Sequence, residues 1–131
     1  MMHRLRYATG LLAGFWLVLS SAAHSVLGWR QVHAELGASS APADLVFAID
    51  AGWQFAGVAM LCFALIVITT LRKRYREPSV SALPIDLVGL AYVAYGVWAL
   101  IMSNWDLFFL IFLIPGLLLL CATPRGVPRG A

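Results

Sequence analysis

Charged residues are scarce in this chain of 131 residues: only 11% are Asp, Glu, Lys or Arg, whereas 62% are hydrophobic. A soluble domain usually has about 25% charged residues, so this chain has too few to cover a soluble globule. The mean hydropathy of +0.87 points the same way. The composition therefore predicts a single integral membrane domain over residues 1–131, with no length left for a separate soluble catalytic domain.

Catalytic motifs are also missing from the sequence. It contains no CxxC pair, no phosphate-binding loop, no carboxylate pair and no nucleophile with an evident base. An enzyme site needs such a set of groups, so we predict no catalytic residue. The two cysteines, Cys62 and Cys121, are expected at different depths in the membrane. We expect both to be unpaired, small apolar residues.

Four apolar segments have the length of helices that cross a bilayer, which takes roughly 20 residues. They cover residues 7–27, 45–71, 83–103 and 107–122. The connection 103–106 is so short that the last two helices must form an antiparallel hairpin. Asp44 is predicted to cap the second helix, while Pro84 and Asp86 fall in the first turn of the third. The sequence thus predicts an all-α fold, an antiparallel bundle of four transmembrane helices.

Basic residues decide the predicted orientation, because cytoplasmic flanks of spans collect Lys and Arg. All basic residues except Arg30 fall on one side of the four spans: Arg4, Arg6, Arg72, Lys73, Arg74, Arg76, Arg125 and Arg129. Both termini are therefore predicted to be cytoplasmic, in a multi-pass protein of a bacterial inner (cell) membrane. This asymmetry accounts for the net charge of +3 without a nucleic-acid partner. Attraction of RKRYR to anionic lipid headgroups is a secondary interpretation.

The first 25 residues also have features of a signal peptide, with a basic start and small residues at SSAA. The apolar run is longer than a usual signal core, and cleavage would put RKRYR and the C-terminal arginines on opposite sides. We therefore predict an uncleaved first span. Gly10 and Gly14 have a spacing that lets helices approach closely. Gly52 and Gly57 are the corresponding packing residues of the second span.

One polar cluster is predicted near the outer ends of the spans. His24 and Gln54 each lie 17 residues from the inner end of their span, roughly 25 Å at 1.5 Å per residue. Asp50 shares a helix face with Gln54. Ser25, Arg30 and Asn104 are expected nearby. Such groups form a functional-site hypothesis, but water and headgroups are close. We therefore favour a hydrogen bond from His24 to Asp50 or Gln54 that fixes helix packing over catalysis.

A metal site is not predicted from the same residues. Zinc sites use three or four ligands, and His24, His33 and Asp50 are the only candidates in this region. The first helix is expected to end after Gly28, which leaves His33 in a loop. A haem held by two histidines is disfavoured because His3 lies on the opposite side. We therefore expect no metal and no cofactor.

The motif HSVLG, residues 24–28, followed by WQFAG, residues 53–57, resembles a group of small uncharacterised bacterial membrane proteins. In that group a His-Ser-x-Leu-Gly signature closes the first of four helices. The resemblance covers roughly the first half of the chain and implies this topology with His24 paired to Gln54. A histidine often follows the second-helix tryptophan in the group, where this chain has Gln54, which argues against a shared metal or haem. The resemblance implies no established activity.

Three functions from different classes are compatible with these features. The favoured one is an accessory or interaction protein, whose bundle binds other membrane proteins or a second copy within the lipid bilayer. The alternative is a carrier or permeation path for a small solute or proton, with His24 and Asp50 at its outer mouth. No polar residue links this cluster to Asp86 at the inner end. A membrane enzyme is the third, and it lacks a recognisable catalytic set.

Overall fold

The computed structural model of this chain describes residues 2–123, and this part is entirely helical apart from short connections. The helices are α1 (Met2–Ala23), η1 (His24–Gly28), α2 (Trp29–Ala38), α3 (Ala43–Arg76), α4 (Leu83–Met102), η2 (Leu107–Phe109) and α5 (Leu110–Ala122). The prediction of an all-α fold is therefore confirmed. Arg125 and Arg129, which contribute to the predicted orientation, lie outside the described residues.

Within residues 2–123, three helical segments are long and apolar enough to cross a membrane, judged by length and composition. They are the segment Arg4–Ala38, α3 and α4, and a shorter apolar segment follows at Leu107–Ala122. The predicted count of four helices is in agreement with this result. Pro84 and Asp86 fall in the first turn of α4, as predicted.

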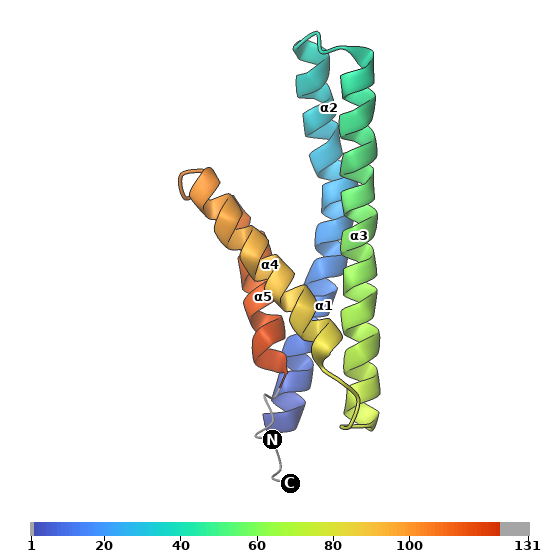
Figure 1. Cartoon of the computed structure of the whole chain (residues 1–131), viewed down its shortest axis with the longest axis vertical. Coiled ribbons are helices and arrows are strands. Elements are labelled where there is room, and N and C mark those ends of the chain that lie inside the picture. The colour runs from blue at the N-terminus through green and yellow to red at the C-terminus, as the bar shows by residue number, and fades with distance from the viewer. Residues whose placement is uncertain (1, 124–131) are drawn as a thin grey trace.

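The helices form two pairs that diverge from a common end. α1 packs along α3, α4 packs along α5, and the pairs meet through contacts of α1 with α5 and of α3 with α4. Figure 1 shows the pairs joined where α1 begins and α5 ends, and separated toward their connecting loops. Side chains without any solvent exposure fill the junction: Leu17, Ala64, Val67, Ile85 and Leu119. The molecule is therefore an open V with a sealed base.

The first helix continues past the point where the sequence predicted its end. Gly28 has helical backbone angles (φ −62°, ψ −42°), and η1 joins α1 to α2 as a π-helical turn. The prediction that His33 lies in a loop is therefore wrong, because His33 is in α2. Glycine is needed at position 28 for another reason: a Cβ there would lie 2.9 Å from Cζ2 of Trp53. Gly28 permits close helix packing and does not terminate the helix.

The second long helix extends beyond its predicted span at both ends. α3 has 34 residues and is about 51 Å long at 1.5 Å per residue, whereas a hydrocarbon core is about 30 Å thick. Pro42 occupies its N-cap and Asp44 lies in its first turn without a capping hydrogen bond, so the predicted cap at Asp44 is wrong. A carboxylate there still favours the positive end of the helix. The whole RKRYR segment, residues 72–76, is helical rather than part of a loop.

Glycines set the close approaches between helices. A Cβ on Gly10 would lie 2.8 Å from Leu71 Cδ1, and one on Gly14 would lie 2.8 Å from Ile68 Cγ1. The assignment of Gly52 to helix packing is corrected, because a Cβ there would meet nothing within 4 Å. In the second pair, a Cβ on Gly96 would lie 2.8 Å from the backbone nitrogen of Leu113. Backbone-to-backbone contact therefore holds α4 against α5.

Candidate functional site

His24 and Trp53 form a reciprocal contact between η1 and α3. Their rings are stacked, with centroids 4.3 Å apart and an interplanar angle of 5°. His24 Nε2 lies 3.1 Å from the backbone oxygen of Trp53, and Trp53 Nε1 donates to the backbone oxygen of His24 at 2.8 Å. Each side chain thus binds the other residue's main chain. These two hydrogen bonds, together with the stacked rings, fix the position of α3 along the first helix.

The π-helical turn supplies the acceptors for this contact. The backbone oxygen of His24 accepts from the N–H of Trp29, five residues later, and also from the Trp53 indole. The next carbonyl, on Ser25, lies 3.5 Å from Gln54 Nε2, a long hydrogen bond. A carbonyl has two lone pairs, so one can bond within the helix and the other across to α3. We call His24, Ser25, Trp53 and Gln54 the helix clamp.

The contacts of the clamp determine which ring nitrogen of His24 carries a hydrogen. A backbone oxygen only accepts hydrogen bonds, so the nitrogen that faces Trp53 O, which is Nε2, has to carry a hydrogen. The other ring nitrogen, Nδ1, has no hydrogen-bond partner within residues 2–123. His24 also lines the cleft between the two helix pairs. Its ring therefore serves the helix contact on one side and borders open space on the other.

Gly57 lets the first helix approach α3 just below the clamp. Ser21 Oγ donates to the backbone oxygen of Gly57 at 2.8 Å, and Ser21 is buried. A Cβ on Gly57 would lie 2.0 Å from Ser25 Oγ and 3.6 Å from His24 Cδ2. No larger residue fits without movement of these side chains. Gly57 is therefore part of the same contact, below Trp53 and Gln54.

The other members of the predicted polar cluster do not join the clamp. Asp50 is half-buried and makes no hydrogen bond or ion pair to the described part of the chain. Arg30 is exposed on α2. Asn104 is exposed in the connection after α4, with a φ of 55°, and this hairpin makes no contact with η1 or α2. The structure brings together His24, Ser25 and Gln54, and it leaves Asp50, Arg30 and Asn104 outside.

The predicted hydrogen bond from His24 to Asp50 or Gln54 is absent and is replaced by the bond to Trp53 O. His24 and Gln54 were predicted to lie at equal depth. In the structure Gln54 contacts Ser25, the residue after His24. The Trp53 indole is half-buried against His24. Trp105, by contrast, is 71% exposed.

A cleft of about 350 Å³ lies between the two helix pairs next to the clamp. The side chains that line it come from η1 and from three helices: His24, Ala56, Ala59, Met60, Phe63, Ala91, Tyr92, Tyr95 and Phe112. The small alanine side chains of α3 and α4 leave space in the cleft, and aromatic side chains form most of the rest of its wall. Tyr95 and Phe112 meet edge to face with centroids 4.9 Å apart. The cleft is therefore a largely apolar recess between the two helix pairs.

Tyr92 lies at the base of this cleft and carries an unsatisfied polar atom. The side chain is 6% exposed, and its hydroxyl is buried without a hydrogen-bond partner. Phe63 and Phe112 contact its ring, with centroids 6.5 and 6.1 Å away. A buried hydroxyl without a partner is unfavourable by about 1–3 kcal/mol. Such a group gains stability from any acceptor that reaches it.

Within residues 2–123, no three His, Cys, Asp or Glu side chains converge as metal ligands. The His33 ring contacts the Trp29 ring in a tilted arrangement, with centroids 5.0 Å apart and an interplanar angle of 51°. Cys62 and Cys121 are free and exposed, in agreement with the prediction that they do not pair.

Comparison with family models, with curated proteins and with solved structures gives no match for this chain.

Reasoning from the sequence named Gly57 as a packing residue, but it missed the packing role of Gly28 and the cleft. Gly28 follows HSVL as Gly57 follows WQFA, and a glycine at the end of each motif was a signal for close helix contact. The cleft residues gave a weaker signal, because Tyr92 and Tyr95 are three residues apart and share a face of α4. Nothing in the sequence placed Phe63 and Phe112 opposite them.

Proposed function

We propose that this chain is an accessory or interaction protein of a bacterial inner-membrane complex, and that the cleft receives a transmembrane helix of its partner. α1, α3, α4 and the shorter α5 cross the bilayer in this proposal, with the arginine-rich end in the cytoplasm. The clamp holds the first helix pair rigid, and the cleft between the pairs is the docking surface.

The observation that carries the proposal is the lining of the cleft. Ala56, Ala59 and Ala91 leave room for the backbone of another helix, and small residues are what helix contacts in membranes use. The aromatic rings of Phe63 and Tyr95 border this floor. Large aromatic side chains dominate the energetics of protein interfaces. A helix with a hydrogen-bond acceptor at the depth of Tyr92 would also satisfy the buried hydroxyl.

The base of the V supports docking over permeation. Leu17, Val67 and Ile85 have no exposed surface there, and a path for a solute or proton would need polar groups or water through this layer. The polar clamp lies on the open side of the junction. We therefore place the carrier function second.

A further surface for a partner lies beyond the bilayer. The helix of residues 2–38 is about 55 Å long at 1.5 Å per residue, well above the roughly 30 Å of hydrocarbon. α2 and the start of α3 therefore extend past the outer leaflet when the arginine-rich end is inside. Phe47, on this part of α3, is 72% exposed. A partner's extramembrane segment would cover it.

Site-directed photocrosslinking in the native membrane tests the proposal. A photoreactive phenylalanine analogue is placed at Ala91, which lines the cleft, and in a matched variant at Leu90, which is exposed on α4 and does not line it. We expect a discrete protein adduct from position 91, with a yield at least tenfold above that from position 90. Mass spectrometry of the adduct then identifies the partner or a second copy.

Equal crosslinking from both positions, or lipid adducts alone, would contradict a helix in the cleft. As a second test, Ala59→Trp fills the cleft, and Val58→Trp adds the same side chain to an exposed position beside it. Only the first substitution is expected to remove the partner from the purified protein.

A further inference from the structure

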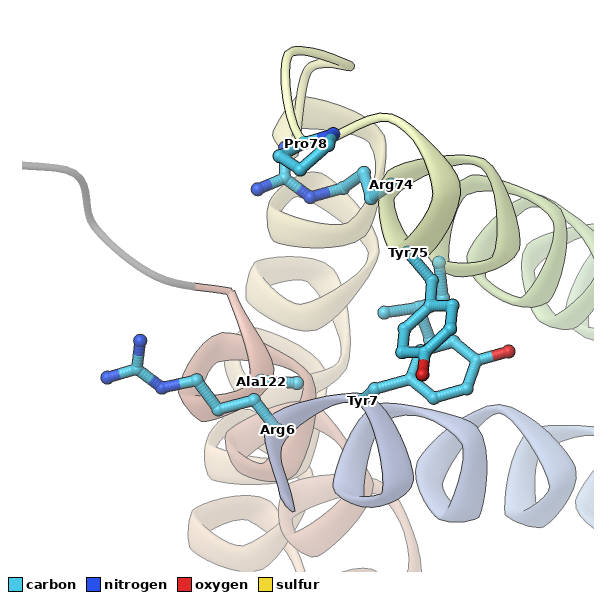
Figure 2. A pocket seen from close by; sticks show the side chains of 7 residues that line it. Arg6, Tyr7, Arg74, Tyr75, Pro78 and Ala122 are labelled. Carbon is cyan, nitrogen blue, oxygen red and sulfur yellow. The ribbon is translucent and has the colours of Figure 1, made fainter. Parts of the chain in front are cut away.

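A second hollow lies at the opposite end of the molecule, where the helix pairs join. It has a volume of about 320 Å³ and is bordered by the start of α1, the end of α3 and the end of α5. Figure 2 shows Tyr7 and Tyr75 against each other on one side, Arg74 beside Pro78, and Arg6 extending past Ala122. The residues that line it come from three separate segments, 6–7, 71–78 and 122, so the fold creates the hollow.

The charged side chains that line this hollow are both arginines, Arg6 and Arg74. Arg74 donates one N–H to the backbone oxygen of Val80, and a guanidinium has five N–H donors, so most of its donors have no partner within residues 2–123. Arg6 makes no hydrogen bond or ion pair to the described part of the chain. Orientation and helix capping explain basic residues at this end. They do not explain two uncompensated guanidinium groups around one hollow.

The carboxylates close to this end are bonded elsewhere. Asp86 accepts a hydrogen bond from Thr123 Oγ1 at 2.5 Å, and Glu77 accepts one from Ser79 Oγ at 3.1 Å. Neither residue lines the hollow. Among the described residues the wall is therefore positive, and none of them would present a negative charge to an anion that entered the hollow.

The rest of the wall is apolar or aromatic. Leu71 and Ala122 are each 5% exposed and form the floor. Gly10 makes this floor close-packed, since a Cβ there would lie 2.8 Å from Leu71 Cδ1 and 3.2 Å from Ala122 Cβ. The rings of Tyr7 and Tyr75 are 4.4 Å apart between centroids. Tyrosine is typical of the membrane–water boundary, where one end of the ring is apolar and the other is wet.

We propose that this hollow binds the phosphate of an anionic phospholipid from the leaflet at the arginine-rich end. Arg6 and Arg74 bind the phosphate oxygens, because guanidinium groups form strong, charge-assisted hydrogen bonds to phosphate. Tyr7 and Tyr75 flank the glycerol region, and the acyl chains leave along the exposed apolar surface of the helices. This site rests on the membrane location in the proposed function, and it is independent of the partner in the cleft.

The test is native mass spectrometry of the full chain released from nanodiscs that contain equal amounts of phosphatidylglycerol and phosphatidylcholine. The double variant Arg6→Gln with Arg74→Gln removes the two arginines of the hollow. Arg72→Gln with Arg76→Gln is the matched control, because both residues are exposed in the same basic segment and do not line the hollow. We expect the hollow variant to retain at least tenfold less phosphatidylglycerol than the control, and phosphatidylcholine to change in neither.

Equal loss in the two double variants would overturn the site, because it would show general attraction to basic charge. Unchanged retention in both would overturn it as well. If 10 mM inorganic phosphate displaced the lipid signal completely, the hollow would bind free phosphate, and the lipid proposal would be wrong. If the Arg74 variant does not assemble, Arg6→Gln alone is compared with Arg72→Gln alone. Arg6→Gln is suitable because it removes no hydrogen bond or ion pair within residues 2–123. The helix content of every variant is checked by circular dichroism.

Discussion

The imidazole of His24 stacks on the indole of Trp53 at 4.3 Å, and each of these residues hydrogen-bonds to the other's backbone oxygen. Polar groups within membrane helices usually raise the question of catalysis or transport. Here both ring donors are used by main-chain oxygens across a helix contact. The arrangement explains how a histidine at this depth contributes to assembly of the first helix pair.

Substitution of Trp53 by Phe is expected to loosen this pair. The indole donor to His24 O is lost, while a ring remains for stacking on the imidazole. We expect a loss of about 0.5–1.5 kcal/mol in unfolding free energy, the range for one hydrogen bond, because the His24 oxygen keeps its bond from the N–H of Trp29. Thermal unfolding in detergent, followed by circular dichroism, measures this change. Trp105→Phe is the control because Trp105 is 71% exposed, and an equal loss there would contradict the role of the clamp.

Two glycines of α3 should respond in opposite directions to the same substitution. Gly57→Ala places a Cβ against Ser25, so we expect destabilisation by about 1–3 kcal/mol, as for other overpacked sites. Gly52→Ala meets nothing within 4 Å, and alanine in a helix is favoured over glycine by roughly 0.5–1 kcal/mol. The Gly52 variant should therefore unfold at the same temperature as the wild type or higher. A Gly57 variant as stable as the Gly52 variant would refute close packing at the clamp.

The hairpin of α4 and α5 depends on Gly96. A Cβ there would lie 2.8 Å from the backbone nitrogen of Leu113 and 3.0 Å from its Cα, and a backbone cannot rotate away as a side chain can. We expect Gly96→Ala to separate the two helices and to destabilise the protein by about 1–3 kcal/mol or more. Crosslinking between cysteines introduced in α4 and α5 would detect the separation. Gly37→Ala, in open space on α2, is the control.

Asp50 distinguishes an interaction protein from a carrier. Since Asp50 has no hydrogen bond or ion pair within the described residues, Asp50→Asn should change the stability by less than about 0.5 kcal/mol. Assembly with the partner should also be unchanged, which co-purification measures. Proton or solute flux is then compared in vesicles with wild-type and variant protein. A variant that assembles normally and loses a measured flux would show that the carrier function is correct.

Hydropathy predicted the helices well because the length of an apolar run determines where a span can lie. It could not predict that the first helix continues to Ala38. Gly28 and the polar residues after it are typical of a helix end, yet here Gly28 makes room for the Trp53 ring. The contact that requires a glycine here is made by Trp53, 25 residues further along the chain. The local sequence around Gly28 therefore does not reveal it.

The candidate site was predicted only in part for a related reason. Counting residues from the inner ends placed His24 and Gln54 at similar depth, and they are in fact close. Depth alone does not give the direction of a side chain around the helix axis, so Trp53 rather than Gln54 or Asp50 became the partner of His24. The divergence of the helix pairs was not predictable either, because it depends on the whole of the packing between α1, α3 and α4.

The π-helical turn at residues 24–28 also determines how the outer part of the molecule faces its surroundings. Such a turn contains one residue more than an α-helical turn, and each residue of an α-helix corresponds to a rotation of about 100°. α2 is therefore rotated by that angle from where an uninterrupted helix would carry it. Arg30 and His33 take their direction from this offset, while the packing of α1 within the V stays the same. The HSVLG segment therefore sets the rotation of α2 about the helix axis relative to α1.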